Sequence, residues 1–176
     1  VIASEDRRFR EHWGLPFRSV ARAIFANALS LSYSLGFSTF PQQLARNLYK
    51  SPGFEDSIIR KIKEVITAIQ IERTYTKDEI LEMYLNTVHF GHGTFGVQAA
   101  AKRFYGKRAN ELTLDEAALL VGLLPSPAIY SPIRHPDRAN RRRNTVLRLM
   151  REEGYVTLSK YAEARAQSLD KINDEP

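Results

Sequence analysis

The stretch TLDEAALLVGLL, residues 113–124, decides the fold of this chain. Thr113 followed by Glu116 three residues later is the pattern of a capping box, in which each side chain satisfies the free backbone amide of the other residue. The residues behind it are apolar on nearly every side, which is typical of a helix buried in the centre of a domain. We therefore expect a buried helix over 114–124, with the rest of the chain packed around it.

Helical periodicity continues on both sides of this stretch. It predicts helices behind Pro16, over 41–49, over a stripe formed by Ile58, Ile62, Val65, Ile66 and Ile69, and over 77–85, 97–105 and 139–153. Closely spaced glycines at 91, 93 and 96 predict a turn, and no clean alternating strand pattern is present. The predicted fold class is therefore all-α (α-rich). We expect one domain over 1–168, a polar tail over 169–176, and two lobes divided near the Ser-rich loop 29–37.

Composition excludes several classes of chemistry. The 176 residues fit one domain of ordinary size, and they include no cysteine and four histidines. Disulfides, thiolate metal sites and cysteine nucleophiles are thereby excluded. His89 and His92 are a conceivable metal pair, but no third ligand stands at a suitable spacing, so we predict no metal site.

The charge balance indicates an anionic partner. There are 26 Lys and Arg against 20 Asp and Glu, a formal net charge of +6. Nucleic acid, a lipid surface and a phosphorylated substrate all fit this balance. The basic residues are spread out except at 141–143, which argues against nucleic acid. No run of 18 apolar residues and no signal peptide is present, and the chain opens at Val1 without an initiator methionine. We expect a domain of a longer protein, with any membrane anchor outside this sequence.

Glu5 is the first candidate for chemistry. Asp6 follows it directly, and Phe9 and Trp13 supply aromatic neighbours. Desolvation and an adjacent like charge both raise the pKa of a carboxyl group, which suits a general base or acid near neutral pH. The alternative is a surface glutamate at a charged helix start, and composition alone favours that alternative.

Glu64 is the second candidate. At 100° per residue, Lys61, Glu64 and Glu72 share a helix face that borders the apolar stripe. The alternative is a pair of helix-edge salt bridges, such as Arg60 with Glu64. Two separated carboxylates in an α-rich domain are typical of acid–base chemistry on glycosides.

A polar block over 38–47 and a basic cluster over 60–63 complete the candidate site. Hydroxyls, amides and a helix N-terminus can hold sugar hydroxyls or phosphate oxygens. Arg60, Lys61 and Lys63 could neutralise a pyrophosphate leaving group beside Glu64. The alternatives are an ordinary capped helix start and a solvated helix face.

Five ordered motifs over 1–153 resemble those of the peptidoglycan glycosyltransferase domain, glycosyltransferase family 51, found in class A penicillin-binding proteins and monofunctional transglycosylases. They are Glu5-Asp6-x-x-Phe9-x-x-His12-x-Gly14, Gly36-x-Ser38-Thr39-x-x-Gln42-Gln43-x-x-Arg46-Asn47, Arg60-Lys61-x-x-Glu64, ILEMYLN at 80–86 and RRNTVL at 142–147. Arg46 stands where the family usually has lysine, which keeps the charge and changes its geometry.

The resemblance implies a lysozyme-like fold with a head lobe and a membrane-facing jaw lobe. It implies polymerisation of lipid II into glycan strands, with inversion at C1 of the donor N-acetylmuramic acid and release of undecaprenyl pyrophosphate. Glu5 is then the general base and Glu64 a supporting carboxylate. The resemblance places the remaining site residues around the substrate: Asp6, Phe9, His12, Ser38, Thr39, Gln43, Arg46, Asn47, Arg60 and Lys61.

The resemblance also sets expectations about surroundings. No cofactor is required, although an Mg2+ or Mn2+ ion at the pyrophosphate is compatible with the family. The implied partners are lipid II, the growing glycan strand, the membrane surface and a transpeptidase domain or other cell-wall synthesis proteins, but no nucleic acid. The implied location is the extracytoplasmic face of the bacterial plasma membrane.

Two other functions fit the same residues. A muramidase-like hydrolase would share the fold and the buried glutamate, but it has no pyrophosphate for Arg46, Arg60 and Lys61 to neutralise. A binding module that scaffolds cell-wall synthesis would need neither Glu5 nor Glu64.

Overall fold

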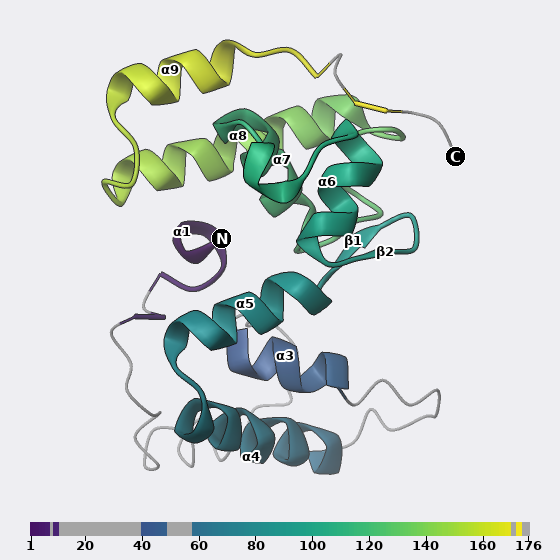
Figure 1. Ribbon diagram of the computed structural model, residues 1–176, viewed down its shortest axis with the longest axis vertical. Coiled ribbons are helices and arrows are strands. Elements are labelled where there is room, and N and C mark those ends of the chain that lie inside the picture. Colours follow the sequence, from purple (N-terminus) through teal and green to yellow (C-terminus); the bar gives the residue numbers. More distant parts are fainter. Residues whose placement is uncertain (8, 11–39, 49–57, 170–171, 174–176) are drawn as a thin grey trace. The chain divides into compact units, whose positions relative to one another are not determined.

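A computed structural model describes residues 1–7, 9–10, 40–48, 58–169 and 172–173 (Figure 1). The described elements, in chain order, are α1 (Ile2–Glu5), α3 (Phe40–Leu48), α4 (Ile58–Thr74), α5 (Lys77–Thr87), β1 (His89–Gly91), β2 (Thr94–Phe95), α6 (Val97–Tyr105), the 3-10 helix η1 (Ala109–Glu111), α7 (Leu114–Leu123), α8 (Pro136–Glu152) and α9 (Leu158–Ala166). The helix-rich class predicted from the sequence is confirmed. No helix among these residues is long and apolar enough to cross a membrane.

The chain divides into two compact units. Unit 1 contains residues 1–5 and 85–176, and unit 2 contains residues 6–84. Two units were expected, but the predicted division near the loop 29–37 is wrong, because residues 29–37 fall within the range 6–84 that forms unit 2. The division falls after Glu5 and after Tyr84 instead. The helix predicted behind Pro16 and the loop 29–37 lie outside the described residues.

Helix α7 forms the core of unit 1, as its sequence predicts. Leu119, Leu120 and Leu123 are each at most 2% exposed. On the neighbouring helix α8, Val146 and Leu147 are similarly buried and form a hydrophobic cluster with Ala118 of α7 and Ala164 of α9. Helix α7 contacts α6, α8, α9 and β1, so its apolar residues pack against several elements, which places this helix at the centre of unit 1.

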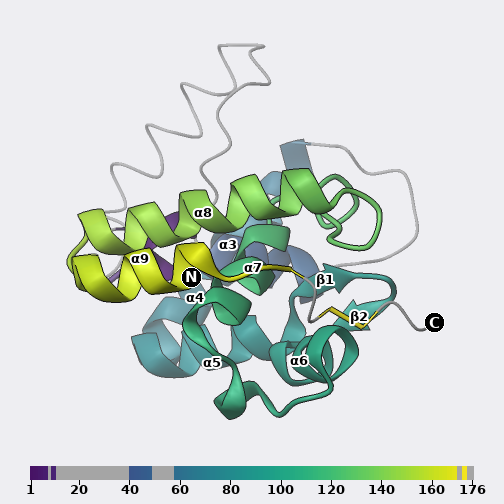
Figure 2. The same ribbon diagram turned by 90° about the horizontal axis from the view of Figure 1, so that it is seen from above.

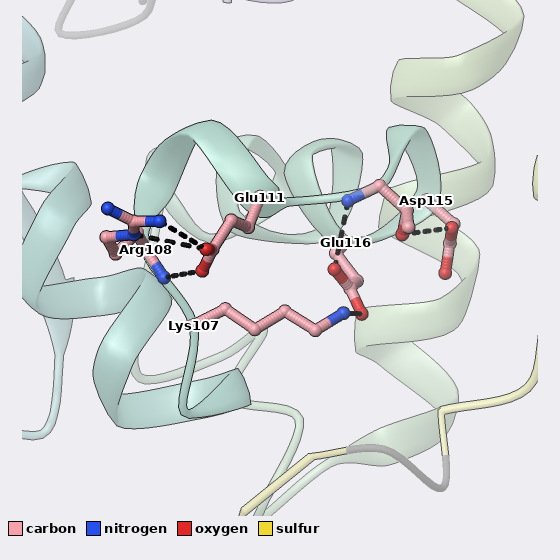
Figure 3. A network of polar contacts seen from close by, with 6 residues as sticks. Lys107, Arg108, Glu111, Asp115 and Glu116 are labelled. Carbon is pink, nitrogen blue, oxygen red and sulfur yellow. Dashed lines mark hydrogen bonds and ion pairs between the residues drawn. The ribbon is translucent and has the colours of Figure 1, made fainter.

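The N-terminus of α7 is fixed by its predicted cap (Figure 3). The backbone amide of Thr113 donates to Oε2 of Glu116 at 3.0 Å, and Nζ of Lys107 lies 2.7 Å from Oε1 of the same carboxylate. Glu116 is only 1% exposed, so its buried charge is compensated by a cation and an amide. In the same view Arg108 pairs with Glu111 at 2.9 Å across the exposed start of η1.

Helices α8 and α9 form an antiparallel hairpin, seen in both views (Figures 1 and 2). Helix α8 begins at Pro136 rather than at the predicted residue 139, because proline is well suited to the first turn of a helix. Helix α9 was not predicted. Thr157 caps it by accepting a hydrogen bond from the Lys160 amide.

Arg143 on α8 binds backbone carbonyls at the C-terminal end of α9. Its side chain is 1% exposed, and Nη1 donates to the carbonyl of Gln167 at 2.8 Å while Nη2 donates to the carbonyl of Arg165 at 3.2 Å. These carbonyls belong to the last turn of α9, which has no helical amide left to bind them. Farther along, the Asn173 amide donates to the Phe104 carbonyl at 2.9 Å, so part of the predicted polar tail is bound to α6.

A short β-hairpin replaces the simple turn predicted at residues 91–96. Strands β1 and β2 pair antiparallel, with His89 opposite Phe95. Gly96 ends the hairpin at φ +84°, where an added Cβ would lie 2.7 Å from the Asn86 carbonyl oxygen. Glycine is therefore required here for both backbone conformation and space.

Unit 2 contains α3, α4 and most of α5. Phe40, Leu44 and Ala45 of α3 are buried, and α3 packs on α4. The predicted capping box of α5 is confirmed, since the Thr76 amide donates to Glu79 Oε2 at 2.7 Å and the Glu79 amide donates to Thr76 Oγ1 at 3.3 Å.

Candidate active site

Glu5 is the last residue of α1, a single helical turn at the start of unit 1. The amides of Ser4 and Glu5 both donate to the carbonyl of Val1, at 3.1 and 3.0 Å. Ala3 is 3% exposed, and α1 packs on α8. This anchoring leaves the Glu5 side chain only 11% exposed, so the alternative of a surface glutamate is wrong.

Arg142 on α8 is the charged neighbour of Glu5. Its Nη2 lies 3.6 Å from Oε1 of Glu5, and its side chain is 23% exposed. That separation is an ion pair but exceeds a good hydrogen bond. Within the described residues, Oε1 of Glu5 and Nε of Arg142 are both buried without a hydrogen-bond partner. The carboxylate is thus paired by charge while this oxygen keeps its capacity to accept a proton.

Burial raises the pKa of Glu5 above the usual value of a carboxyl group. The Arg142 guanidinium opposes this rise, and the Ser4 hydroxyl opposes it to a smaller extent. The sequence correctly indicated desolvation, but the neighbouring charge is the cation of Arg142, which lowers the pKa of Glu5, rather than the like charge of Asp6, which was expected to raise it. A raised pKa makes the ionised Glu5 a stronger base than an exposed carboxylate.

Glu64 lies on a buried face of α4 in unit 2. It is 1% exposed, as is Ala68 one turn later, and the side chain of Glu72 is 8% exposed. The helical spacing predicted that Lys61, Glu64 and Glu72 share a face, and this is confirmed for Glu64 and Glu72. The predicted apolar stripe is wrong at Ile66, which is 52% exposed. On this helix Glu64 and Glu72 are therefore less exposed to solvent than the apolar residue Ile66.

A chain of contacts joins Glu72 to the aromatic core of unit 2. Lys77 Nζ lies 3.0 Å from Glu72 Oε1 and 4.8 Å from the centroid of the Phe9 ring. Phe9 meets Phe40 edge to face, with centroids 4.9 Å apart, and Phe40 contacts Tyr84. Phe9 is 2% exposed, so the structure places this ring in the core rather than at a substrate-facing surface.

Two members of the polar block on α3 have described side chains. Gln43 is half-buried and its amide oxygen accepts a 3.0 Å hydrogen bond from the Tyr84 hydroxyl. Asn47, one turn later, is also half-buried. Asp6, the first residue of unit 2, is half-buried too.

Several predicted residues have no described side chain. Arg46 belongs to α3, and Arg60 and Lys61 belong to α4, but their side chains lie outside the described part of the structure. His12, Ser38 and Thr39 lie wholly outside it. Their assignments stay predictions.

Sequence reasoning missed the role of Arg142. The motif at 142–147 was recognised, and its arginine doublet was the available signal. The two arginines serve different ends: Arg143 binds the carbonyls at the end of α9, and Arg142 pairs with Glu5. Consecutive helix positions point about 100° apart, which explains why neighbours in the sequence have separate partners.

The described residues offer no ready-made metal site. Among them, no three His, Asp or Glu side chains gather closely enough to hold an ion. Oε1 of Glu72 is paired with Lys77, and Oε1 of Glu5 is paired with Arg142.

The chain was also compared with known families, proteins and structures. A family model described as Transglycosylase matches residues 1–151, and the chain belongs to this family. Glu5, Glu64 and Arg142 all lie within the matched range. The expected family is thereby confirmed.

The relatives are penicillin-binding proteins. The chain is 43% identical over 168 residues to penicillin-binding protein 1F of Bacillus subtilis, covering 96% of this chain and 23% of that protein. It is 48% identical over 163 residues to penicillin-binding protein 1A of Aquifex aeolicus (93% and 22%), and 45% identical over 169 residues to that of Escherichia coli (96% and 20%). The chain thus spans about a fifth of these relatives.

A solved structure supports the fold. The crystal structure of penicillin-binding protein 1A from Haemophilus influenzae matches with a TM-score of 0.50 and 31% sequence identity, over 72% of this chain and 16% of that chain. The expected fold class, that of the transglycosylase domain, is confirmed.

Proposed function

We propose that this chain is a peptidoglycan glycosyltransferase domain that polymerises lipid II into glycan strands. Membership of the transglycosylase family supports the reaction class. The observation that carries the proposal is Glu5: a carboxylate 11% exposed, with a pKa raised by burial and one oxygen that lacks a hydrogen-bond partner among the described residues. These are the properties of a general base for an alcohol.

In the proposed reaction, Glu5 removes the proton from the 4-hydroxyl of the acceptor N-acetylglucosamine. The freed oxygen attacks C1 of the donor N-acetylmuramic acid from the face opposite the pyrophosphate. The bond between C1 and the pyrophosphate oxygen breaks, its electron pair leaves with undecaprenyl pyrophosphate, and the configuration at C1 inverts. The proton on Glu5 then passes to solvent.

The residues of unit 2 are proposed to hold the donor. Gln43 and Asn47 present amide groups from one helix, and the Tyr84 hydrogen bond fixes the orientation of Gln43. Ser38 and Thr39 precede that helix and are assigned to the same side, with Asp6 and His12 of the first motif. Phe9 supports the site from the core.

Cations are proposed to neutralise the leaving group. Arg46, Arg60 and Lys61 are assigned to the donor pyrophosphate, whose charge grows as the bond to C1 breaks. Glu64, buried on the helix of Arg60 and Lys61, is proposed as the supporting carboxylate. A divalent ion that accompanies the pyrophosphate would then belong to the substrate, and Mg2+ or Mn2+ are the candidates.

The surroundings follow from the same proposal. Lipid II and the growing strand place the domain at the extracytoplasmic face of the bacterial plasma membrane, where the net charge of +6 suits anionic lipid. A transpeptidase domain in the same protein and other cell-wall synthesis proteins are the proposed partners, since the relatives are named penicillin-binding proteins.

The test compares Glu5→Gln with the natural protein on purified lipid II, with glycan strands separated by gel. We expect Glu5→Gln to lower the rate by about 10²- to 10⁴-fold, because the base is lost. Glu163→Gln, an exposed carboxylate on α9, is the control and keeps the natural rate. A normal rate for Glu5→Gln would show that the base is assigned wrongly.

The same preparation tests the other functions. Clearing of preformed peptidoglycan without strand synthesis would indicate a hydrolase. Tight lipid II binding without turnover would indicate a binding module.

A further inference from the structure

Two residues outside the motif of Arg142 confine its side chain. The ring of Tyr130, in the segment between α7 and α8, lies 5.7 Å from the Arg142 guanidinium carbon, within range of a cation–π contact. On α7, a Cβ added at Gly122 would lie 3.2 Å from Cγ of Arg142. The guanidinium of Arg142 therefore lies beside the Tyr130 ring. Its aliphatic stem runs close to Gly122, where there is no side chain in the way.

Space is the reason for glycine at position 122. Glycine weakens a helix relative to alanine, and Gly122 lies inside the buried central helix. Its φ does not fall in the left-handed region, so the backbone conformation does not require glycine. An alanine there would lie closer to the Arg142 stem than an ordinary van der Waals contact, so the stem would have to shift by a few tenths of an ångström.

The position of the guanidinium matters because of its distance to Glu5. At 3.6 Å the charges attract, but Oε1 of Glu5 is left without a hydrogen bond from Arg142. A closer, bidentate pair would occupy the carboxylate oxygens. A more distant guanidinium would no longer orient the carboxylate or favour its ionised form.

We propose that Tyr130 and Gly122 are positioning residues, which hold the Arg142 guanidinium where it orients the Glu5 carboxylate and leaves Oε1 open to a substrate hydroxyl. This inference rests on the proposed role of Glu5 as the base. Among the described residues, the charged side chain that acts on Glu5 is Arg142 from α8. Tyr130 and Gly122 act on Arg142.

The test measures the pH dependence of lipid II polymerisation for Tyr130→Leu and Gly122→Ala in the full natural protein. Both changes release the guanidinium from its place, so the acidic limb of the rate profile is expected to move to higher pH. We expect kcat/KM at about pH 6 to fall roughly three- to tenfold and to approach the natural value above about pH 8. Tyr130→Phe keeps the ring and should keep the natural profile.

A double-mutant cycle with Arg142→Met separates positioning from a general loss of structure. If Tyr130 and Gly122 act through Arg142, neither substitution shifts the profile further in the Arg142→Met background. The inference is overturned by shifts that persist in that background. Natural profiles for both single variants, beside a shifted profile for Arg142→Met, also overturn it. Tyr130 lies outside the helices, so Tyr130→Leu decides the matter if Gly122→Ala does not fold.

A readout without substrate keeps this inference separate from the proposed function. The Glu5 carboxyl is followed by 13C NMR titration and assigned by its loss in Glu5→Gln. Displacement of Arg142 should raise the Glu5 pKa in both variants relative to the natural protein. An unchanged titration refutes the positioning role even if polymerisation is normal, whereas absence of polymerisation by the natural protein refutes the proposed function alone.

Discussion

The hydroxyl of Tyr84 donates a 3.0 Å hydrogen bond to the side-chain oxygen of Gln43, joining α5 to α3. Tyr84 is 0% exposed, and Gln43 is half-buried. The buried Tyr84 hydroxyl needs a hydrogen-bond acceptor. The side-chain oxygen of Gln43 therefore stays turned toward Tyr84 rather than toward solvent. Gln43 is therefore held from the core side, which restricts how its remaining polar atoms can meet a donor sugar or phosphate.

Tyr84→Phe removes this hydrogen bond with little change of volume. We expect the free energy of unfolding to fall by about 0.5–1.5 kcal/mol, the usual net value of such a bond. We also expect KM for lipid II to rise more than kcat falls, because Gln43 is assigned to binding. Urea unfolding and initial rates measure the two effects. Tyr75→Phe, at a residue 44% exposed, is the control and should change neither. An unchanged KM for Tyr84→Phe would remove Gln43 from the donor side.

Glu5→Gln should stabilise the fold at neutral pH while it lowers activity. Folding raises the pKa of Glu5, so the native state binds more protons than the unfolded state between the ordinary and the raised value. The free energy of unfolding therefore falls as the pH rises through that window. Glutamine has no charge to bury and avoids this loss.

Denaturant unfolding at two pH values measures the effect. The stability difference between Glu5→Gln and the natural protein should be present at about pH 7.5 and shrink below about pH 4, where the carboxyl group is protonated in both states. A variant that is less stable at neutral pH would mean that the ion pair with Arg142 outweighs burial.

Glu116→Gln should weaken unit 1. The substitution removes the charge that Lys107 meets at 2.7 Å and weakens the cap on the Thr113 amide. We expect a loss of about 1–3 kcal/mol in the free energy of unfolding, because a buried, charge-assisted contact is lost. Burial opposes ionisation of Glu116, but its hydrogen bonds with Lys107 and Thr113 hold its pKa below the usual range. The stabilisation by the natural carboxylate is therefore lost as the pH falls through that lowered pKa.

Glu111→Gln is the matched control for Glu116. It also pairs with a basic residue near a helix start, but it is exposed to solvent. Surface pairs contribute little, so no measurable change is expected. Equal effects of the two substitutions would contradict the central role of the α7 cap.

Comparison of Gly96→Ala with Gly154→Ala separates the steric cost of an added Cβ from the cost of holding a non-glycine residue at positive φ. Both glycines have positive φ, +84° and +76°, but only at Gly96 does an added Cβ meet another atom, the Asn86 carbonyl oxygen at 2.7 Å. We expect Gly154→Ala to cost about 1 kcal/mol for the backbone alone. Gly96→Ala should cost roughly 2–4 kcal/mol, since the hairpin or the end of α5 must shift. Thermal unfolding of both variants tests this, and equal costs would show that the hairpin yields freely.

Helices whose ends are set by neighbouring residues in the sequence were predicted correctly. The capping boxes at Thr76 and Thr113 and the glycine after Tyr105 place the ends of α5, α6 and α7 to within two residues. Helix α9 was missed because Ala164 is its only fully buried residue, so its apolar periodicity is weak. The hairpin was missed because two strands this short give no alternating pattern.

The site could be predicted only in part, because its geometry depends on tertiary contacts. The motifs identified Glu5 and Glu64, and the helical spacing gave the shared face of Glu64 and Glu72. No local pattern indicates that Arg142, far along the chain, faces Glu5. Likewise, the exposure of Ile66 and the burial of Glu64 depend on which helices cover α4, and the sequence of α4 alone does not determine that.

Arg143 also bears on where this domain can be cut. The family match ends at residue 151, but the guanidinium of Arg143 donates to the carbonyls of Arg165 and Gln167. A recombinant fragment trimmed at the family boundary would lack α9 and both carbonyl acceptors, so Nη1 of Arg143 would lose its described partner and Nη2 would keep only Oδ1 of Asn144. Expression vectors for crystallisation or inhibitor screening should therefore extend at least through Asn173, whose amide is bound to α6.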